Sequence, residues 1–260
     1  YEFTSQPGVV LRLHLLRRDG GEKTKETYLS VSDAKGWHDW VEGLRPHFSS
    51  ELRDEPASSG AKEAPSYSAL LETTNAQLVA FAPRGIGRSA WDGSPKKQAQ
   101  IRRRFMLLGQ TLESMQVWDI RRAMQALRSL PDAQGIPVTI VGSGESAAMA
   151  LYASLFEPPV DRLVFTKLPR SHRDGPNFLN ILRFLDMPQA VALAAERSPL
   201  VLFSRDSADL HLVPARSVAQ FGVPQPPEWE YPIAVAKSLD WKPEQLQFQF
   251  DEIKPPADKK

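Results

Sequence analysis

Short apolar segments recur along the chain and predict β-strands. Residues 9–16 alternate between apolar and polar positions, and residues 27–32 give a second strand after a charged, glycine-containing turn. We expect these two strands to form an opening hairpin, antiparallel to the rest of the sheet. Five further apolar segments predict the remaining strands: residues 77–82, 138–141, 163–166, 200–204 and 246–250.

Helical periodicity separates these strands. Apolar residues fall at steps of three and four around Trp37 and Trp40, and again between residues 101 and 130. Further helices are expected at residues 147–156, 178–195 and 231–239. Strands that alternate with helices of this length require crossover connections, which predict a mostly parallel central sheet flanked by helices. The fold class is therefore α/β, with antiparallel first strands.

The chain shows no internal repeat and no linker that would divide it, so residues 1–260 are expected to form one domain. Residues 49–67 are polar, with Pro, Ser, Gly and alternating charges, and predict a long surface insertion. Residue 1 is Tyr rather than Met, and the strand pattern starts almost at once. We expect the chain to be a fragment or the C-terminal part of a longer protein.

Composition excludes several classes of function. Lys and Arg number 32 and Asp and Glu number 31, so the net charge of +1 gives no basic excess for binding nucleic acid. The most basic stretch, residues 96–104, is interpreted as a solvated loop and helix start. The absence of cysteine excludes disulfides, thiolate catalysis and cysteine-bound metals. No apolar run approaches the ~20 residues of a membrane helix.

The most informative segment is residues 140–148, IVGSGESAA, where an apolar strand enters a turn of small residues and a helix follows. This is the context of a nucleophile elbow, the sharp turn that presents a catalytic side chain at the edge of a hydrolase sheet. Two registers fit the requirement for small residues around the apex. Either Gly144 is at the apex and no nucleophile is present, or Ser146 is at the apex with Ala148 behind it.

The phase of the following helix favours the first register. Common hydrolase elbows continue as small, small, apolar, apolar, Ala-Leu-Tyr-Ala, and residues 147–153 match this pattern best with Gly144 at the apex. A tight strand–helix turn without chemistry is therefore preferred to a catalytic Ser146.

Several segments in order resemble the acetyl xylan esterase-like branch of the α/β hydrolases. Residues 82–89, APRGIGRS, look like that family's D-x-R-G-x-G-x-S loop, with Ala82 where Asp is common. Residues 108–123 are similar to the helix before the elbow, and residues 178–188 with 199–202 are similar to its late helix and penultimate strand. The resemblance covers roughly residues 3–250.

The resemblance implies a serine esterase that acts on carbohydrate esters, with Ser at the elbow, Asp after the penultimate strand and His after the last strand. Asp206 follows residues 200–204 and matches the acid position. The mechanism needs an oriented imidazole to take the proton of the hydroxyl. However, residues 251–260 contain no histidine, so a base would have to be His211 or His172 on a displaced loop. The triad is therefore degraded.

An oxyanion hole depends less on sequence because backbone N–H groups form it. Residues 32–36, which include Asp33, are expected to supply one donor, and Glu145 or Ala147 the second. No histidine pair has metal-ligand spacing with a carboxylate, so no metal is expected. The glycine-rich residues 84–88 lack the Lys-Ser/Thr of a phosphate loop, and no cofactor is expected.

Two hypotheses from different classes remain. The favoured one is a catalytically degenerate hydrolase-like domain, a pseudoenzyme, which binds a small-molecule ligand or another domain of the same protein, or has a structural role. The alternative is an active carboxylesterase on carbohydrate esters that uses Ser146, Asp206 and His211 or His172. Trp91 and Trp229 are the candidate sugar-stacking side chains, whereas Trp118 is expected in the core. The resemblance favours a secreted or periplasmic location, with neither nucleic acid nor a membrane as partner.

Overall fold

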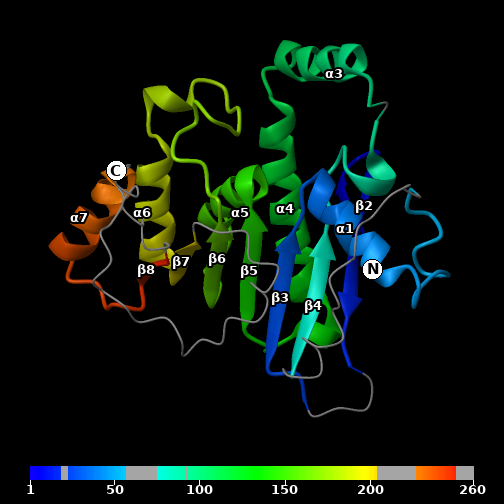
Figure 1. The fold of residues 1–260 in the computed structure, drawn as a ribbon, viewed down its shortest axis with the longest axis horizontal. Helices are drawn as coiled ribbons and strands as arrows, with labels where there is room; N and C mark the ends of the chain where they lie inside the picture. The colour runs from blue at the N-terminus through cyan, green and yellow to red at the C-terminus, as the bar shows by residue number, and fades with distance from the viewer. Residues whose placement is uncertain (19–22, 57–74, 92, 204–226, 250–260) are drawn as a thin grey trace, which may run out of the picture.

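The computed structural model describes residues 1–18, 23–56, 75–91, 93–203 and 227–249. They form an eight-stranded sheet with helices on both sides (Figure 1). The strand order is β1-β2-β4-β3-β5-β6-β7-β8. The strands are β1 (Glu2–Gln6), β2 (Val9–Leu16), β3 (Glu26–Val31), β4 (Ala76–Phe81), β5 (Val138–Ser143), β6 (Arg162–Thr166), β7 (Leu200–Phe203) and β8 (Leu246–Gln249).

Six strands, β4, β3, β5, β6, β7 and β8, are parallel to one another. The pairs β1–β2 and β2–β4 are antiparallel. This confirms the predicted fold class. The predicted hairpin is wrong, however. β2 pairs with β1 on one side and with β4 on the other, and β3 lies beyond β4 in the parallel part. The buried pattern of β3 explains the difference, because a strand covered on both faces suits the interior of a parallel sheet.

The helices are α1 (Ala34–Leu44), α3 (Pro95–Leu107), α4 (Leu112–Ser129), α5 (Gly144–Leu155), α6 (Met187–Arg197) and α7 (Glu230–Ser238), with 3₁₀ turns η1 (Gly87–Ser89), η2 (Pro131–Ala133), η3 (Ile181–Arg183) and η5 (Pro227–Trp229). Within the described ranges, every helix is too short or too polar to cross a lipid bilayer.

One hydrophobic core joins α4, α5 and α6 to one face of the sheet, where β4 contributes Val79 and Phe81. Ala80 points to the opposite face and packs with Trp37, Trp40 and neighbouring residues of α1. This alternation follows from the period of two along a strand. The two faces of β4 are thus covered by different helices, and the carboxyl ends of the parallel strands form one edge of the sheet.

The long helical region predicted at residues 101–130 is two helices. The chain leaves α3 at Leu107, and Thr111 caps the start of α4 by accepting a hydrogen bond from the Ser114 N–H. In Figure 1, α3 lies at the top, away from the sheet, and Ile101 is its one buried residue. Its basic residues 96–104 are mostly exposed, as expected of a solvated segment.

A helix was predicted at residues 178–195, but α6 begins only at Met187. Asp186 is its N-cap, and its carboxylate accepts hydrogen bonds from the N–H groups of Met187 and His172. Residues 177–185 contain only the short turn η3. The apolar residues of this stretch resembled a helical face, but Pro188 and the Asp186 cap fix the helix start later in the chain.

In the described part of the predicted surface insertion, residues 49–56, Leu52 and Glu55 are buried and the other residues are exposed, as predicted. Two predictions about exposure are wrong. Trp118 was expected in the core, but it is 38% exposed and donates its indole N–H to the Ser5 carbonyl at 3.0 Å. Trp229 is 3% exposed and belongs to the main core, so it offers no stacking surface.

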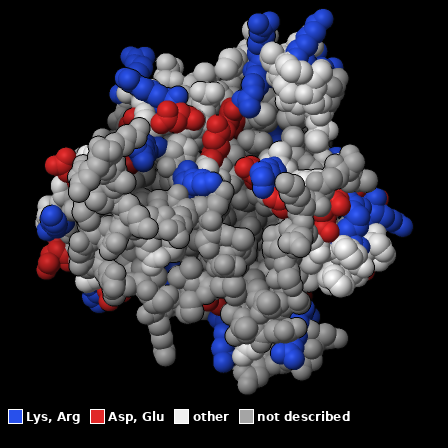
Figure 2. Space-filling model, in the orientation of Figure 1, with Lys and Arg blue, Asp and Glu red and all other residues white. Residues whose placement is uncertain are grey.

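The surface carries charges of both signs. Figure 2 shows Lys and Arg side chains interspersed with Asp and Glu on the face in view. On the described part of this face, basic side chains do not form a continuous stripe. This distribution agrees with the balanced charge of the whole sequence.

Candidate functional site

The turn between β5 and α5 lies at the carboxyl edge of the sheet, in the centre of the strand order. β5 runs through Gly142 to Ser143, and α5 begins at Gly144. Val31 at the end of β3 pairs with Gly142, so the segment after β3 starts beside the turn. In open parallel sheets, ligands commonly bind at this edge.

Glycine has a different role at each of the two turn positions. A Cβ on Gly142 would lie 2.9 Å from Ala147 Cα and 3.0 Å from Ala147 N. Gly142 is therefore needed for the close approach of strand and helix backbones. Gly144 has a φ of +58°, and a Cβ there would meet nothing within 4 Å. Gly144 thus provides a left-handed turn that opens into free space.

Ser146 lies inside the first turn of α5, and 1% of it is exposed. Its Oγ is 3.0 Å from the Val31 carbonyl and 2.8 Å from the Ser143 carbonyl, both acceptors for its one proton. The same oxygen accepts a long hydrogen bond of 3.3 Å from the Ser143 N–H. The hydroxyl is therefore hydrogen-bonded to backbone groups. No histidine is among its partners in the described part of the chain.

His172 follows β6 and is 5% exposed. Its Nε2 shares a hydrogen bond of 2.6 Å with the Tyr152 hydroxyl, and its Nδ1 lies 3.0 Å from the Pro176 carbonyl. A carbonyl only accepts, so Nδ1 carries the proton and Nε2 accepts from Tyr152. Both nitrogens are thus used in fixing residues 172–178 against α5. Asp206 and His211 lie outside the described residues.

The two residues expected at the oxyanion hole are close enough to interact. The Asp33 side chain caps α1 by accepting from the Gly36 N–H at 2.7 Å. Burial raises the pKa of the Glu145 carboxyl, and the negative charges of Glu113 and Asp33 add to this, while Arg102 opposes it. Carboxylates of three different elements therefore gather near the turn.

Glu113 is 4% exposed and forms an ion pair with Arg102 of α3, so α3 is tied to the start of α4 beside the turn. Glu145 lies against Gly175, where a Cβ would be 2.6 Å from Glu145 Oε1. Sequence reasoning missed Glu113 because a lone glutamate at a helix start is normally a favourable first-turn residue. The described residues contain no group of His, Asp and Glu that would hold a metal ion.

The loop after β4, residues 82–89, is one of the segments that carry the family resemblance, and a buried ion pair fixes it. The Arg84 guanidinium donates to Asp119 of α4 at 2.7 Å from Nε and 2.6 Å from Nη2. The Arg84 N–H and the Ser5 hydroxyl donate to the same carboxylate. Asp119 is fully buried with all these donors, so the Arg84 end of the motif is structural.

Comparisons with protein-family models and with curated proteins find no match. Solved structures do match. An assigned acetyl xylan esterase from Bacteroides fragilis superposes with a TM-score of 0.58 at 14% identity, covering 98% of this chain and 66% of that chain. A glucuronoyl esterase from Solibacter usitatus gives 0.55 at 13% identity, covering 95% and 73%. An acylaminoacyl peptidase from Pyrococcus horikoshii gives 0.52 at 13% identity, covering 96% and 36%.

The matches cover almost the whole of this chain, including its mostly parallel sheet, its antiparallel first strands and the helices on both faces. The chain has the α/β-hydrolase fold. At these identities the likeness extends to the fold alone, because one fold carries many different sites. The chain also spans less than the full length of each of these proteins, about two thirds of the first and about a third of the peptidase.

Proposed function

We propose that this α/β-hydrolase-fold domain does not hydrolyse esters at its elbow and serves a structural, ligand-binding or partner-binding role. The observation that carries the proposal is the burial and hydrogen bonding of the Ser146 hydroxyl. A serine nucleophile must present its oxygen to a substrate and pass its proton to a base. Ser146 Oγ is instead buried and bonded to the Val31 and Ser143 carbonyls.

The charge at the turn gives further support. Acyl transfer builds negative charge on the substrate oxygen, which hydrolases stabilise with preorganised donors. Here the pKa of Glu145 is raised by its burial and by the neighbouring charges of Glu113 and Asp33. A developing oxyanion beside these groups would be destabilised wherever the carboxylates are ionised. With Gly144 at the apex, where a Cβ would meet nothing within 4 Å, the turn carries no side-chain nucleophile.

The test compares Ser146→Ala with Ser154→Ala. Both serines are buried on α5, and Ser154 Oγ donates to the Leu151 carbonyl at 2.6 Å, so it is a matched structural control. We expect the wild type and both variants to hydrolyse p-nitrophenyl acetate at the same low rate. We also expect a fluorophosphonate reagent to leave the mass of the wild-type protein unchanged.

Hydrolysis that is lost in Ser146→Ala but kept in Ser154→Ala, with equal melting temperatures, would overturn the proposal. Covalent labelling of Ser146 would do the same and would support the alternative, an active serine carboxylesterase. Asp206 and His211 would then be tested next by the same assay, as Asp206→Asn and His211→Gln.

A further inference from the structure

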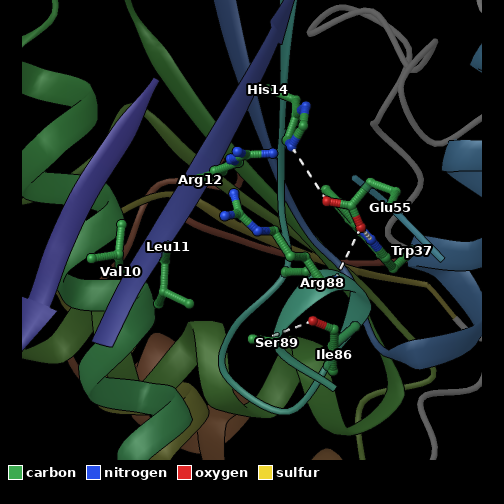
Figure 3. A pocket seen from close by; sticks show the side chains of 10 residues that line it. Val10, Leu11, Arg12, His14, Trp37, Glu55, Ile86, Arg88 and Ser89 are labelled. Carbon is green, nitrogen blue, oxygen red and sulfur yellow. Dashed lines mark hydrogen bonds and ion pairs between the residues drawn. The ribbon is translucent and has the colours of Figure 1, made fainter. Parts of the chain in front are cut away.

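A pocket of about 200 Å³ lies on the face of the sheet that α1 covers, with β4 and β3 between it and β5 in the strand order. It is thus distinct from the elbow. Its walls come from β2, from α1, from the loop after β4 and from the segment that follows α1 (Figure 3). The polar lining residues are Arg12, His14, Glu55, Arg88 and Ser89, and Trp37 supplies an aromatic wall.

One carboxylate oxygen in this pocket accepts no hydrogen bond from the part of the chain that the structure describes. The Glu55 side chain is 3% exposed, and its Oε2 accepts from the Trp37 indole N–H at 2.9 Å and from the Arg88 backbone N–H at 3.1 Å. Its Oε1 has no hydrogen bond from a described residue and faces His14 Nε2 at 4.0 Å. A buried carboxylate normally has donors for both oxygens. Oε1 is therefore an acceptor available to a ligand.

The chain is shaped closely around Glu55. Gly87 has a φ of +57°, and a Cβ there would lie 2.2 Å from Trp37 Nε1 and 2.8 Å from Glu55 Oε2. The loop can cross the Trp37–Glu55 hydrogen bond only with a glycine at this position. Glu55 is thus fixed by tightly packed backbone on the Oε2 side and open on the Oε1 side.

His14 supplies a second open atom. Its Nε2 is buried and has no hydrogen-bond partner among the described residues, and its ring packs edge-on against Trp37 and Trp40 at 5.3 and 5.4 Å. Burial lowers the pKa of His14 to about 4, with contributions from the positive amino terminus and Arg12. The ring is therefore neutral near pH 7 and can accept a hydrogen bond at Nε2. Figure 3 shows His14 and Glu55 pointing toward one another.

Two guanidinium groups border the same space. Arg12 binds Glu2 at 2.8 Å and Asp54 at 3.2 Å, and Arg88 binds Glu2 at 3.1 Å. A cationic ligand would be repelled by both guanidinium groups, and an anionic ligand would be repelled by the buried carboxylate of Glu55. A neutral hydroxyl group avoids both penalties, because it donates to the acceptors and accepts from the arginines.

We propose that this pocket binds a neutral polyol through two vicinal hydroxyl groups. One hydroxyl donates to Glu55 Oε1 and its neighbour donates to His14 Nε2, and these two acceptors lie 4.0 Å apart. The guanidinium groups donate to the hydroxyl oxygens, and the lining side chains of the pocket enclose the carbon skeleton of the ligand. The proposal does not depend on the elbow, because none of these groups belongs to it.

Isothermal titration of the full chain at pH 7 tests the ligand class. The probes are methyl β-D-glucopyranoside and trans-1,2-cyclohexanediol, with cyclohexanol, methylammonium chloride and sodium acetate as comparisons. We expect the glycoside and the diol to saturate a single site at millimolar concentration. Cyclohexanol, which has one hydroxyl, should bind at least about tenfold more weakly, because a hydrogen bond to a charged acceptor is lost.

Variants locate the site. His14→Phe keeps an aromatic ring against Trp37 and Trp40 but removes the acceptor, and Glu55→Gln places an amide N–H₂ where Oε1 accepts. Each should raise the Kd of the diol about tenfold. The matched controls His47→Phe and Glu51→Gln change exposed residues and should leave the Kd unchanged. A melting curve for each variant shows whether the fold is kept.

Saturable binding by methylammonium or acetate that Glu55→Gln abolishes would overturn the assigned ligand class. Equal affinity for cyclohexanol and the diol would overturn the vicinal requirement. An absence of binding by every probe, or diol binding that both pocket variants retain while folded, would overturn the site. None of these results depends on ester hydrolysis, so they leave the proposal about the elbow unaffected.

Discussion

The turn after β5 and the loop after β4 leave the same edge of the sheet, and each contains at least one glycine with a positive φ, yet the hydrogen bonding of their polar groups differs. At the elbow, the Ser146 hydroxyl is bonded to two backbone carbonyls. In the pocket beside the β4 loop, Glu55 Oε1 and His14 Nε2 have no hydrogen-bond partner among the described residues. The turn that resembles a nucleophile elbow thus has its hydroxyl bonded within the fold, whereas the pocket presents two acceptor atoms for which we propose a ligand.

This contrast shows that a motif and a site are different things. A strand–turn–helix of small residues follows from the packing of β5 against α5, because Gly142 must allow Ala147 to approach. Function requires in addition a side chain that can present a polar atom to a ligand or substrate. Three predictions test this contrast, and they are given in order of decreasing effect.

The largest effect is expected where the β4 loop is anchored. Asp119→Ala would leave the buried Arg84 guanidinium without its carboxylate. We expect the free energy of unfolding to fall by about 3–5 kcal/mol, as for other broken buried pairs. Urea denaturation measures it, with Asp39→Ala in the exposed Lys35–Asp39 pair as the control. A loss no larger than that of the control would mean that Arg84 does not anchor the loop.

A smaller effect is expected from His14 and depends on pH. The folded-state pKa of His14, about 4, lies below the ordinary 6.5, so the unfolded chain takes up the proton first on acidification. The contribution of neutral His14 to the free energy of unfolding is therefore fully present above about pH 6.5. It is lost as the pH falls from 6.5 to about 4. The full loss corresponds to about 3 kcal/mol.

His14→Phe removes this titration and keeps an apolar ring against Trp37 and Trp40. Denaturation of both proteins at pH 7.5 and pH 4.5 should show a steeper loss of stability in the wild type. Arg12 and Glu55, which face His14, are present in both proteins and cancel in the comparison. Parallel pH dependences would show that His14 is not held neutral by the fold.

The smallest effect separates the two glycines of the elbow. Gly142→Ala forces a Cβ against the Ala147 backbone and should cost about 2–3 kcal/mol, in the range of overpacked sites. Gly144→Ala only imposes the left-handed φ on a residue with a side chain and should cost about 1 kcal/mol. Thermal unfolding measures both. A larger loss at Gly144 than at Gly142 would contradict the assignment of Gly142 to the close approach.

Much of the architecture could be read from the order of apolar segments. Residues 77–82, 163–166 and 246–250 each predicted a strand that the structure places within one or two residues. The signal is strong in residues 77–82 and 163–166 because a strand buried on both faces needs an apolar run, whereas residues 246–250 are identified by their alternation of apolar and polar positions. The end of the β5 strand and the start of α5 were placed less well, since Gly142 and Ser143 carry no strand propensity of their own.

The pairing of β2 and the roles of single polar residues could not be read in this way. The pattern of a strand and the turn after it do not determine which strands are neighbours in the sheet. We therefore predicted that β2 pairs with β3, whereas it pairs with β1 and β4. Glu55 stands in a polar stretch and looked solvated. It is buried because Trp37 and the Arg88 backbone, both distant in the sequence, supply its donors.

By itself the sequence determined the α/β class, the order of most elements and the absence of a histidine after the last strand, since periodicity and composition are local properties. Only the tertiary structure decided that the Ser146 hydroxyl is bonded to the end of β3 and that His14 faces Glu55. Hydrogen bonding and burial of polar atoms depend on partners that the fold brings together from remote parts of the chain, and such partners leave no mark on the local pattern.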